Sequence, residues 1–305
     1  MKRYTYHFQE VEHCNFCNAP TSKAKVLGKR LNQSQGLFPS KKIGITTTIM
    51  QCSHCKLVFP NPIPFPDTLS QHYDIPPDSY WKPQYFEINI QYFKNQITQF
   101  QKLTNKKEGK VLDIGSGIGK ALIALENAGY EAFGIEPSPP FYQKAIEKMN
   151  IKPEKLQCLS IEEAEYEPNT FDWIIFGAVF EHLYKPSEAL LKAINWLKPN
   201  GLIHIEVPSS NYFLSSLINF LHKIRGSDYV SHLSPMHVPF HIYEFRLSTF
   251  QLHSQLHNYS IRHSILYPCT CYFPPFLDYF AKQWMKLTNT GMQLEVWLQK
   301  KSSLP

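Results

Sequence analysis

The stretch Val111-Leu112-Asp113-Ile114-Gly115-Ser116-Gly117-Ile118-Gly119 is the most informative part of the chain, because an apolar strand runs directly into three glycines. Glycine lets the backbone turn sharply and lets a ligand approach without a Cβ in the way. The helix expected at residues 121–128 would point its free N–H groups at the same place. The spacing is Gly-x-Gly-x-Gly, not the Gly-x-Gly-x-x-Gly of dinucleotide sites, and Asp113 lies two residues before the first glycine. A carboxylate there suits the cationic amino end of a methionine moiety better than a phosphate.

Strands and helices alternate after this loop. Short apolar stretches that predict strands occur at residues 110–114, 131–135, 171–176 and 202–207, and helical segments are expected at 121–128, 139–150 and 187–197. Ser138 is the expected N-cap of the second helix. This alternation predicts an α/β fold with a parallel sheet and helices on both faces.

A second candidate ligand, Glu136, follows the second expected strand and lies 21 residues past Gly115. A carboxylate at the end of that strand can accept hydrogen bonds from both hydroxyls of a ribose. Taken alone, Glu136 would be read as a surface residue at a strand end. The glycine loop at this distance favours the ribose-binding interpretation.

Four motifs in order resemble the class I S-adenosylmethionine-dependent methyltransferases, namely residues 113–119, 134–138, 171–183 and 197–202. The resemblance implies a Rossmann-like sheet of seven strands, which late strands at 260–267 and 293–299 would complete as an antiparallel pair around a helix at 277–287. It also implies S-adenosylmethionine as the cofactor. The residues that would hold this cofactor are Asp113, Gly115, Ser116, Gly117 and Gly119 at the methionine part, Glu136 and Pro137 at the ribose, Ile161 near the adenine, and Phe176, Gly177 and Ala178 on its other side.

Candidate general bases come from position within this family. His182 follows the fourth strand, and His237 and His241 lie in the loop before the late strand pair. An imidazole near its ordinary pKa of about 6.5 suits proton acceptance at neutral pH. The alternative is that all three are core or surface residues and that proximity alone drives methyl transfer. Some ubiquinone-biosynthesis relatives bind a cation through Glu-x-x-Glu-His, but this chain has Ala178 where the first glutamate would be, so no catalytic magnesium is expected.

Two Cys-x-x-Cys pairs, Cys14/Cys17 and Cys52/Cys55, predict a zinc-ribbon-like module with one structural Zn²⁺. Alternating apolar residues at 41–51 suit a β-hairpin leading into the second pair. Free thiols or a redox pair are the alternative. Four thiolates would leave no open position on the metal, so this zinc is not expected to be catalytic.

Three segments are expected along the chain. Residues 1–66 would form the zinc-ribbon-like module and a proline-rich linker, residues 67–105 a helical lid or connector with a helix at 84–103, and residues 106–305 the methyltransferase domain. A further helix at 211–225 is either a lid over the substrate or an ordinary packed helix.

Composition excludes several protein classes. Hydrophobic residues make up 43% and charged residues 18%, as in a folded globular protein. The formal charge of +6 comes from short, scattered basic runs, so nucleic acid is not the expected substrate. The first residues lack an apolar signal segment and no apolar stretch is long enough to span a bilayer, which predicts a cytoplasmic protein without membrane insertion.

The leading functional hypothesis is therefore methyl transfer from S-adenosylmethionine to the oxygen, nitrogen or carbon atom of a small-molecule acceptor. One alternative is an RNA or protein methyltransferase that uses the zinc ribbon for recruitment. Another is a non-catalytic protein that binds the cofactor. No motif indicates an oligomeric state.

Overall fold

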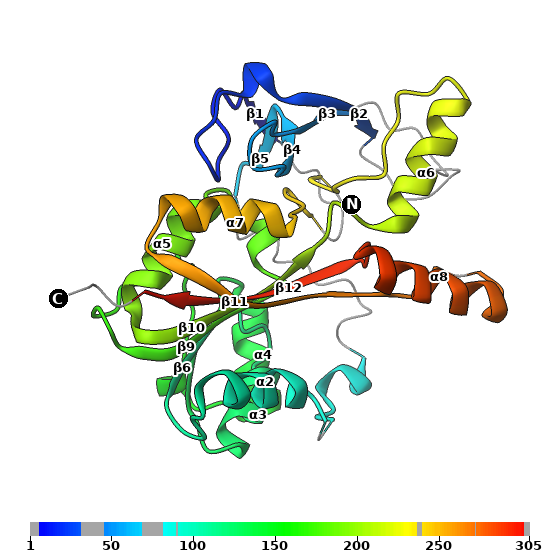
Figure 1. Ribbon diagram of the computed structural model, residues 1–305. Helices are drawn as coiled ribbons and strands as arrows, with labels where there is room; N and C mark the ends of the chain where they lie inside the picture. Colours follow the sequence, from blue (N-terminus) through cyan, green and yellow to red (C-terminus); the bar gives the residue numbers. More distant parts are fainter. Residues whose placement is uncertain are drawn as a thin grey trace.

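The computed structural model describes residues 6–31, 46–68, 82–89, 91–236, 240–271 and 273–301 (Figure 1). Its centre is a seven-stranded sheet in the order β11-β12-β10-β9-β6-β7-β8. The strands are β6 (Lys110–Ile114), β7 (Glu131–Ile135), β8 (Leu156–Gln157), β9 (Phe171–Gly177), β10 (Leu197–Pro208), β11 (Tyr259–Tyr267) and β12 (Gln293–Lys300). Pairing is parallel from β8 to β10, whereas β12 runs antiparallel to both β10 and β11. The predicted Rossmann-like sheet and its antiparallel pair are confirmed.

Helices cover both faces of this sheet. One face carries α2 (Lys94–Thr104), α3 (Lys120–Asn127) and α4 (Pro139–Met149), and the other carries α5 (Pro186–Trp196) and α7 (Leu247–Leu256) (Figure 1). Two hydrophobic cores result, one centred on Phe100, Trp173 and Trp297 and the other on Phe176 and Phe180. Every central strand is buried on both faces, which explains why 171–176 is almost wholly apolar.

One sequence-based boundary and one expected helix cap need correction on the α2 side of the sheet. The helix expected at 84–103 is interrupted, because a short 3-10 turn, η3 (Pro83–Phe86), is separated from α2 by extended and turn residues. Phe93 precedes α2 in the left-handed conformation, with φ of 61°, which an α-helix cannot continue through. Ser138 precedes α4 as expected, but its side chain makes no capping hydrogen bond.

The N-terminal module contains two small sheets. In one, β1 (Tyr6–Gln9) pairs with β5 (Ile63–Pro66), and the other has the order β2 (Lys25–Leu31), β3 (Thr46–Gln51), β4 (Val58–Asn61). The proline-rich stretch is thus not a linker but supplies strands to both sheets. Proline is tolerated there because these short strands lie at sheet edges, where a missing N–H need not break a ladder. Of the expected hairpin at 41–51, only residues 46–51 lie among the described residues, and they form β3.

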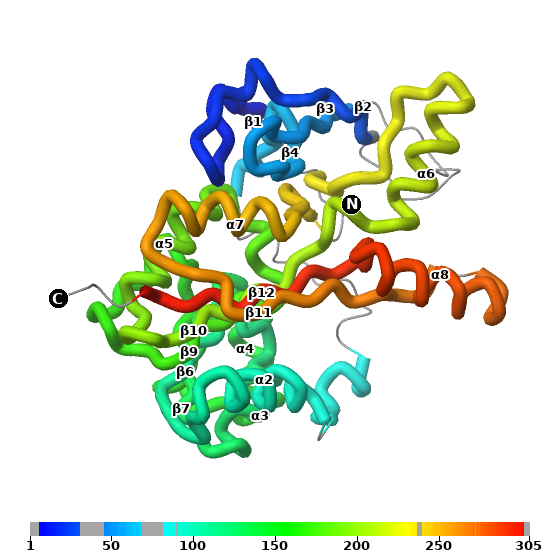
Figure 2. The backbone as a smooth tube through the Cα atoms, in the orientation of Figure 1, coloured from blue at the N-terminus to red at the C-terminus, as the bar shows by residue number. Residues whose placement is uncertain are grey.

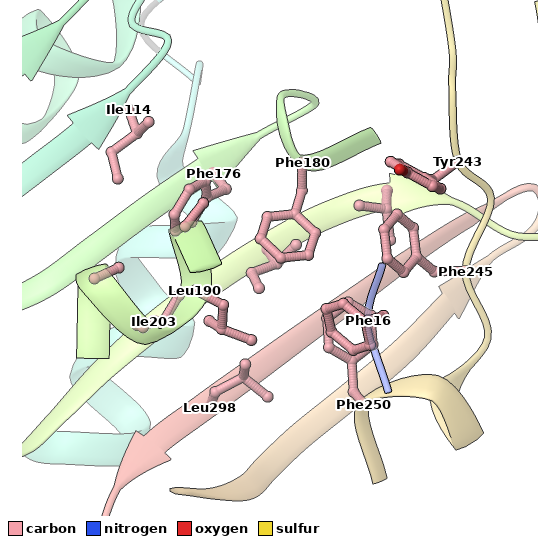
Figure 3. Packing of buried hydrophobic residues seen from close by; sticks show 14 of the residues in the cluster. Phe16, Ile114, Phe176, Phe180, Leu190, Ile203, Tyr243, Phe245, Phe250 and Leu298 are labelled. Atoms are coloured by element: carbon pink, nitrogen blue, oxygen red, sulfur yellow. The ribbon is translucent and has the colours of Figure 1, made fainter. Parts of the chain in front are cut away.

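This module lies directly over α7, although the two are far apart in the sequence (Figure 2). Phe16, between the first two cysteines, is 2% exposed and makes edge contacts with Phe180, Phe245 and Phe250 (Figure 3). Removing a buried phenylalanine side chain costs about 3–5 kcal/mol. The first cysteine pair is therefore part of the core of the main α/β domain and not merely attached to it.

Polar contacts strengthen the same junction. Asn15 Nδ2 donates to the Tyr243 hydroxyl at 2.6 Å, and Thr249 Oγ1 donates to the Cys55 carbonyl at 2.8 Å. On the far side of the module, the Lys29 amide donates to the Asp228 carbonyl at 2.7 Å. The first two bonds connect the cysteine pairs to the segment before α7 and to α7 itself, and the third connects β2 to the loop after α6.

Two more helices follow the carboxyl ends of β10 and β11 and extend from one side of the sheet. They are α6 (Phe213–Ile224), which follows β10, and α8 (Pro275–Thr288), which joins β11 to β12. Both were predicted, and their bounds agree with the sequence expectation to within about two residues. In the described part of the chain, no helix is both long enough and apolar enough to span a membrane.

Candidate cofactor and catalytic site

The candidate site lies where the strand order reverses. The chain passes from β6 outward to β7 and β8, and then crosses to β9 on the other side of β6. Ile114 is in register with both Ile135 and Phe176, so the segments that follow these three strands begin at the same level. In open α/β sheets such a switch point leaves a crevice outside the carboxyl ends of the strands.

The three glycines after β6 all have positive φ, but their surroundings differ. A Cβ on Gly115 would clash with Val179 Cγ2, and one on Gly119 would come within 2.8 Å of Ile151 Cγ1. A Cβ on Gly117, whose φ is 57°, would meet nothing closer than a Phe141 carbon at 3.9 Å among the described residues. Gly115 and Gly119 thus allow close packing of the protein itself, whereas Gly117 faces open space that a ligand can approach.

Glu136 closes the loop from the neighbouring strand. Its Oε2 accepts a hydrogen bond from the Gly117 amide at 2.7 Å and its Oε1 accepts one from the Ser138 amide at 2.8 Å. Each carboxylate oxygen keeps a second lone pair, so the side chain can still accept hydrogen bonds from two ribose hydroxyls. Burial raises the pKa of Glu136 to about 7, although the two amide donors act in the opposite direction.

Asp113 adds a second buried acid beside Glu136. It is 5% exposed, and burial followed by repulsion from Glu136 raises its pKa to about 7. Ser116 Oγ donates to the Asp113 carbonyl at 2.8 Å and fixes the turn between them. Two buried carboxyls with raised pKa values favour a cationic occupant, because a nearby positive charge would stabilise both ionised forms.

These pKa values predict that cofactor affinity depends on pH. Below about pH 7 both carboxyls bind protons that a cationic ligand must displace, so the affinity for S-adenosylhomocysteine should rise from pH 6 to pH 8 and then level off. Each proton released contributes about a tenfold change in affinity per pH unit. Calorimetric titration at these pH values measures the pH dependence of the affinity. Asp113→Asn should reduce that dependence, because it removes one of the two carboxyls. An affinity independent of pH across this range would contradict the assignment.

The remaining predicted cofactor residues differ in what their side chains can reach. Gly177 and Ala178 are exposed at the end of β9, and Pro137 is exposed beside Glu136. The side chains of Phe176 and Ile161 are buried in the hydrophobic core. Their backbones can border a cofactor, but their side chains face away from solvent.

Two of the three predicted histidines come together. The rings of His182 and His241 lie 5.1 Å apart between centroids, and His182 Nδ1 is 3.1 Å from the Phe240 carbonyl. His237 lies outside the described residues. His241 Nε2 is 3.7 Å from Glu181 Oε1, and burial lowers the pKa of His241 below its usual value.

Glu181 belongs to this group and lies within the motif at residues 171–183, but it was not predicted as a site residue. Glu181 is 2% exposed, and its Oε2 has no hydrogen-bond partner among the described residues. Burial, and then repulsion from Glu206, raise the pKa of Glu181 to about 8. A buried carboxyl and a neutral imidazole in contact can share one proton, which is the arrangement expected of an acid–base pair.

A third group of acids was missed altogether. His204 is fully buried, with Nε2 at 3.4 Å from Glu206 Oε1 and 3.6 Å from Glu295 Oε2. Gln96 and Gln293 each donate to Glu206 at 2.8 Å. The alternation Ile203-His204-Ile205-Glu206-Val207 could have revealed this group, because polar residues at every second position of a buried strand must face one another or a ligand.

The four cysteines of the N-terminal module converge. All four sulfur atoms lie within 4.8 Å of one another, with Cys14 Sγ to Cys55 Sγ and Cys17 Sγ to Cys52 Sγ both at 3.6 Å. Tetrahedral zinc with bonds of about 2.3 Å places its sulfurs about 3.8 Å apart. The donor set and its spacing therefore fit one Zn²⁺.

Comparison with known proteins identifies the family. The model of a family described as a methyltransferase domain matches residues 86–263, more than half of the 305 residues. The chain belongs to this methyltransferase domain family. The match covers the glycine loop, Glu136, His182 and His241. The predicted class I methyltransferase fold is confirmed.

Individual relatives cover less of the chain. An uncharacterized methyltransferase of Alkaliphilus oremlandii is 32% identical over 129 residues, 41% of this chain and 58% of the relative. A malonyl-(acyl-carrier protein) O-methyltransferase of Halalkalibacterium halodurans is 28% identical over 149 residues, 40% of this chain and 50% of the relative. The chain thus spans about half the length of the curated relatives it matches. A crystal structure of an S-adenosylmethionine dependent methyltransferase from Mesorhizobium loti aligns with a TM-score of 0.48 and 10% identity, covering 70% of this chain and 98% of that one.

Proposed function

We propose that the protein transfers a methyl group from S-adenosylmethionine to a small-molecule acceptor. The observation that carries this proposal is the pairing of the open Gly117 amide with Glu136, beside a second buried acid at the switch point of a methyltransferase domain. When bound, the cofactor supplies the methyl group on a sulfonium centre. The protein contributes binding, alignment and exclusion of water.

In this proposal the residues divide the work. Asp113 and the loop hold the cationic methionine part, Glu136 holds the ribose, and Gly177 and Ala178 border the cofactor with their backbones. An oxygen acceptor is favoured, because a relative that shares this domain is an O-methyltransferase by name. A hydroxyl nucleophile must lose its proton, and the group formed by Glu181, His182 and His241 can accept it.

A polar groove gives the acceptor a place to bind. It has a volume of 700 Å³ and lies beyond the carboxyl ends of β10 and β11, on the same edge of the sheet as the glycine loop. Arg246 and Lys286 line it together with Ser209, Asn211 and Tyr267. Two cations among neutral polar groups favour an acceptor that carries an anionic group.

Methyl transfer itself is tested with cofactor labelled on the methyl group. The protein is incubated with labelled S-adenosylmethionine and, separately, with the small-molecule, RNA and protein fractions of a cell extract. Label in the small-molecule fraction alone is the expected result. Label in RNA or protein would favour recruitment of a macromolecule by the zinc ribbon. Cofactor binding without label in any fraction would favour the non-catalytic alternative.

The proton acceptor is tested by substitution. His241→Ala is expected to lower kcat by roughly 10², because it removes one positioned base while leaving alignment intact. His182→Ala tests the neighbouring ring in the same assay, and cofactor affinity by calorimetry should stay unchanged in both variants. The exposed His7 lies in β1, outside this group, so His7→Ala is the matched control. Unchanged kcat in both site variants would remove the histidines from the mechanism.

We also propose that Cys14, Cys17, Cys52 and Cys55 hold one structural Zn²⁺. The sulfur spacing supports this proposal, and so does the burial of three of the four thiols. Four thiolate ligands would fill the coordination sphere, so the metal would stabilise the fold and take no part in methyl transfer.

A further inference from the structure

The outward face of α8 is apolar, which is unusual for a surface helix. Six large side chains on this helix are more than half exposed, and we call them the α8 surface: Phe276, Leu277, Tyr279, Phe280, Trp284 and Leu287. Its buried residues are Asp278, Ala281 and Met285. The apolar residues thus lie opposite the buried face, where a surface helix normally carries polar residues.

The far end of α6 carries two more exposed apolar side chains on the same side of the molecule. Phe220 is 60% exposed and Ile224 is 67% exposed. Both helices project from the same side of the molecule, α6 above and α8 below (Figure 1). An open groove of 530 Å³ beside α8 is lined mainly by α8 side chains together with Phe213 of α6 and Phe273. Half of the sixteen exposed large hydrophobic side chains found among the described residues therefore lie on these two helices.

The charges around this region are mainly positive; the exposed acid nearest the end of α6 in sequence, Asp228, pairs with Lys29 at 3.3 Å. Lys282 and Lys286 flank the α8 surface, while Asp278, the acid of α8, is 8% exposed and paired with Lys282 at 2.9 Å. The sequence of α6 contains no acid, and Lys223 and Arg225 at its end are exposed. An apolar face with a basic border matches a partner that is apolar inside and anionic at its surface.

A second copy of the chain fits this pattern less well. In a two-fold contact the same patch meets itself, so the lysines that border one α8 surface would approach those of its partner. Like charges at close range oppose such a contact. Tryptophan and tyrosine, in contrast, are enriched at the boundary between lipid and water, where an amphipathic ring is half in each phase.

We propose that α8 and the end of α6 bind the surface of an anionic phospholipid bilayer. The rings of Phe276, Phe280 and Trp284 enter the interfacial layer, and the lysines reach the headgroups while their stems cover apolar surface. The helices lie on the membrane without crossing it. The polar groove is lined by Lys286 of the same helix, so the bound protein would hold this groove close to the bilayer.

Co-sedimentation of the full chain with vesicles tests this proposal. The protein should sediment with vesicles that contain phosphatidylglycerol and phosphatidylcholine, and much less with phosphatidylcholine alone or at high salt. The triple variant Phe280→Ser, Trp284→Ser, Leu287→Ser should lower partitioning at least about tenfold. Lys223→Glu with Lys286→Glu should weaken binding only to the anionic vesicles.

Leu256→Ser is the matched control, because Leu256 is 55% exposed at the end of α7 and outside the region. It should bind vesicles like the unchanged protein, and all variants should keep the same melting temperature. No sedimentation with anionic vesicles would overturn the proposal, as would binding that the triple variant leaves unchanged. Light scattering that shows a dimer abolished by the triple variant, without vesicle binding, would assign this face to a second copy.

Discussion

Gly117→Val is expected to abolish measurable binding of S-adenosylmethionine, and Glu136→Ala to weaken it by roughly 10- to 100-fold. Valine is strongly disfavoured at the φ of 57° found at Gly117, and its side chain would project into the open space that the loop faces. Removing the Glu136 carboxylate leaves the Gly117 and Ser138 amides without their acceptor and removes the partner of the ribose. Calorimetry with S-adenosylhomocysteine measures both effects.

A matched control separates loss of the site from loss of the fold. Gly226 has a φ of 71°, and a Cβ at this position would meet no atom of the described residues within 4 Å. Gly226→Val therefore imposes the same backbone strain outside the site. Glu147→Ala is the control for Glu136→Ala, because it removes an exposed carboxylate from α4, outside the site. Both controls should keep full affinity. If Gly117→Val and Glu136→Ala bind as tightly as the controls do, the cofactor site lies elsewhere.

The geometry of the candidate cofactor loop could be predicted from sequence because its determinants are local. Strand, glycines and helix follow one another within residues 110–127, and Glu136 directly follows the next strand along the chain. Parallel neighbours in register bring such residues together without long-range information. The prediction therefore needed only hydrophobic pattern and glycine spacing.

The acid–base group could be predicted only in part. The position of His182 after β9 and of His241 before α7 suggested two candidates, but their contact joins residues 59 positions apart, with α5, β10 and α6 between them in the sequence. Glu181 stands out only in the fold, where its second oxygen is buried without a partner in the described part of the chain. Similarly, His204 and Glu206 are neighbours on one strand, whereas Glu295 reaches them through antiparallel pairing of β10 with β12. No local pattern encodes that pairing.

The proline-rich stretch shows why composition misled. Residues 60–66 have the composition of an extended spacer, and they are indeed extended. Extended chain can also pair at an edge, and β5 does so with β1 across more than fifty intervening residues. The error lay in treating an extended conformation as evidence for a boundary. The packing of Phe16 was also not predicted, because nothing near it in sequence indicates that it lies between Phe180 and Phe250.

Cys52→Ser is expected to remove the proposed zinc and to destabilise the whole protein, not only its N-terminal module. A structural zinc site contributes on the order of 10 kcal/mol to the folding of a small module. Cys52 belongs to the same hydrophobic core as Phe16, Phe176 and Phe180, so release of the cysteine pairs would loosen the packing under the candidate catalytic segment. Metal analysis should fall from about one zinc per chain to near zero, together with a clear drop in melting temperature.

Cys158→Ser is the control for this prediction, since Cys158 is exposed and lies outside the four-cysteine group. It should change neither metal content nor melting temperature. A further consequence follows from the bond between Asn15 and the Tyr243 hydroxyl, because it links the first cysteine pair to the segment that carries His241. At a temperature where Cys52→Ser is still folded, kcat should therefore fall more than cofactor affinity, since this bond acts on the segment that carries His241, whereas Asp113 and Glu136 belong to the ends of β6 and β7. A purified protein without zinc, or a Cys52→Ser variant as stable as Cys158→Ser, would show that the thiols do not act through a metal.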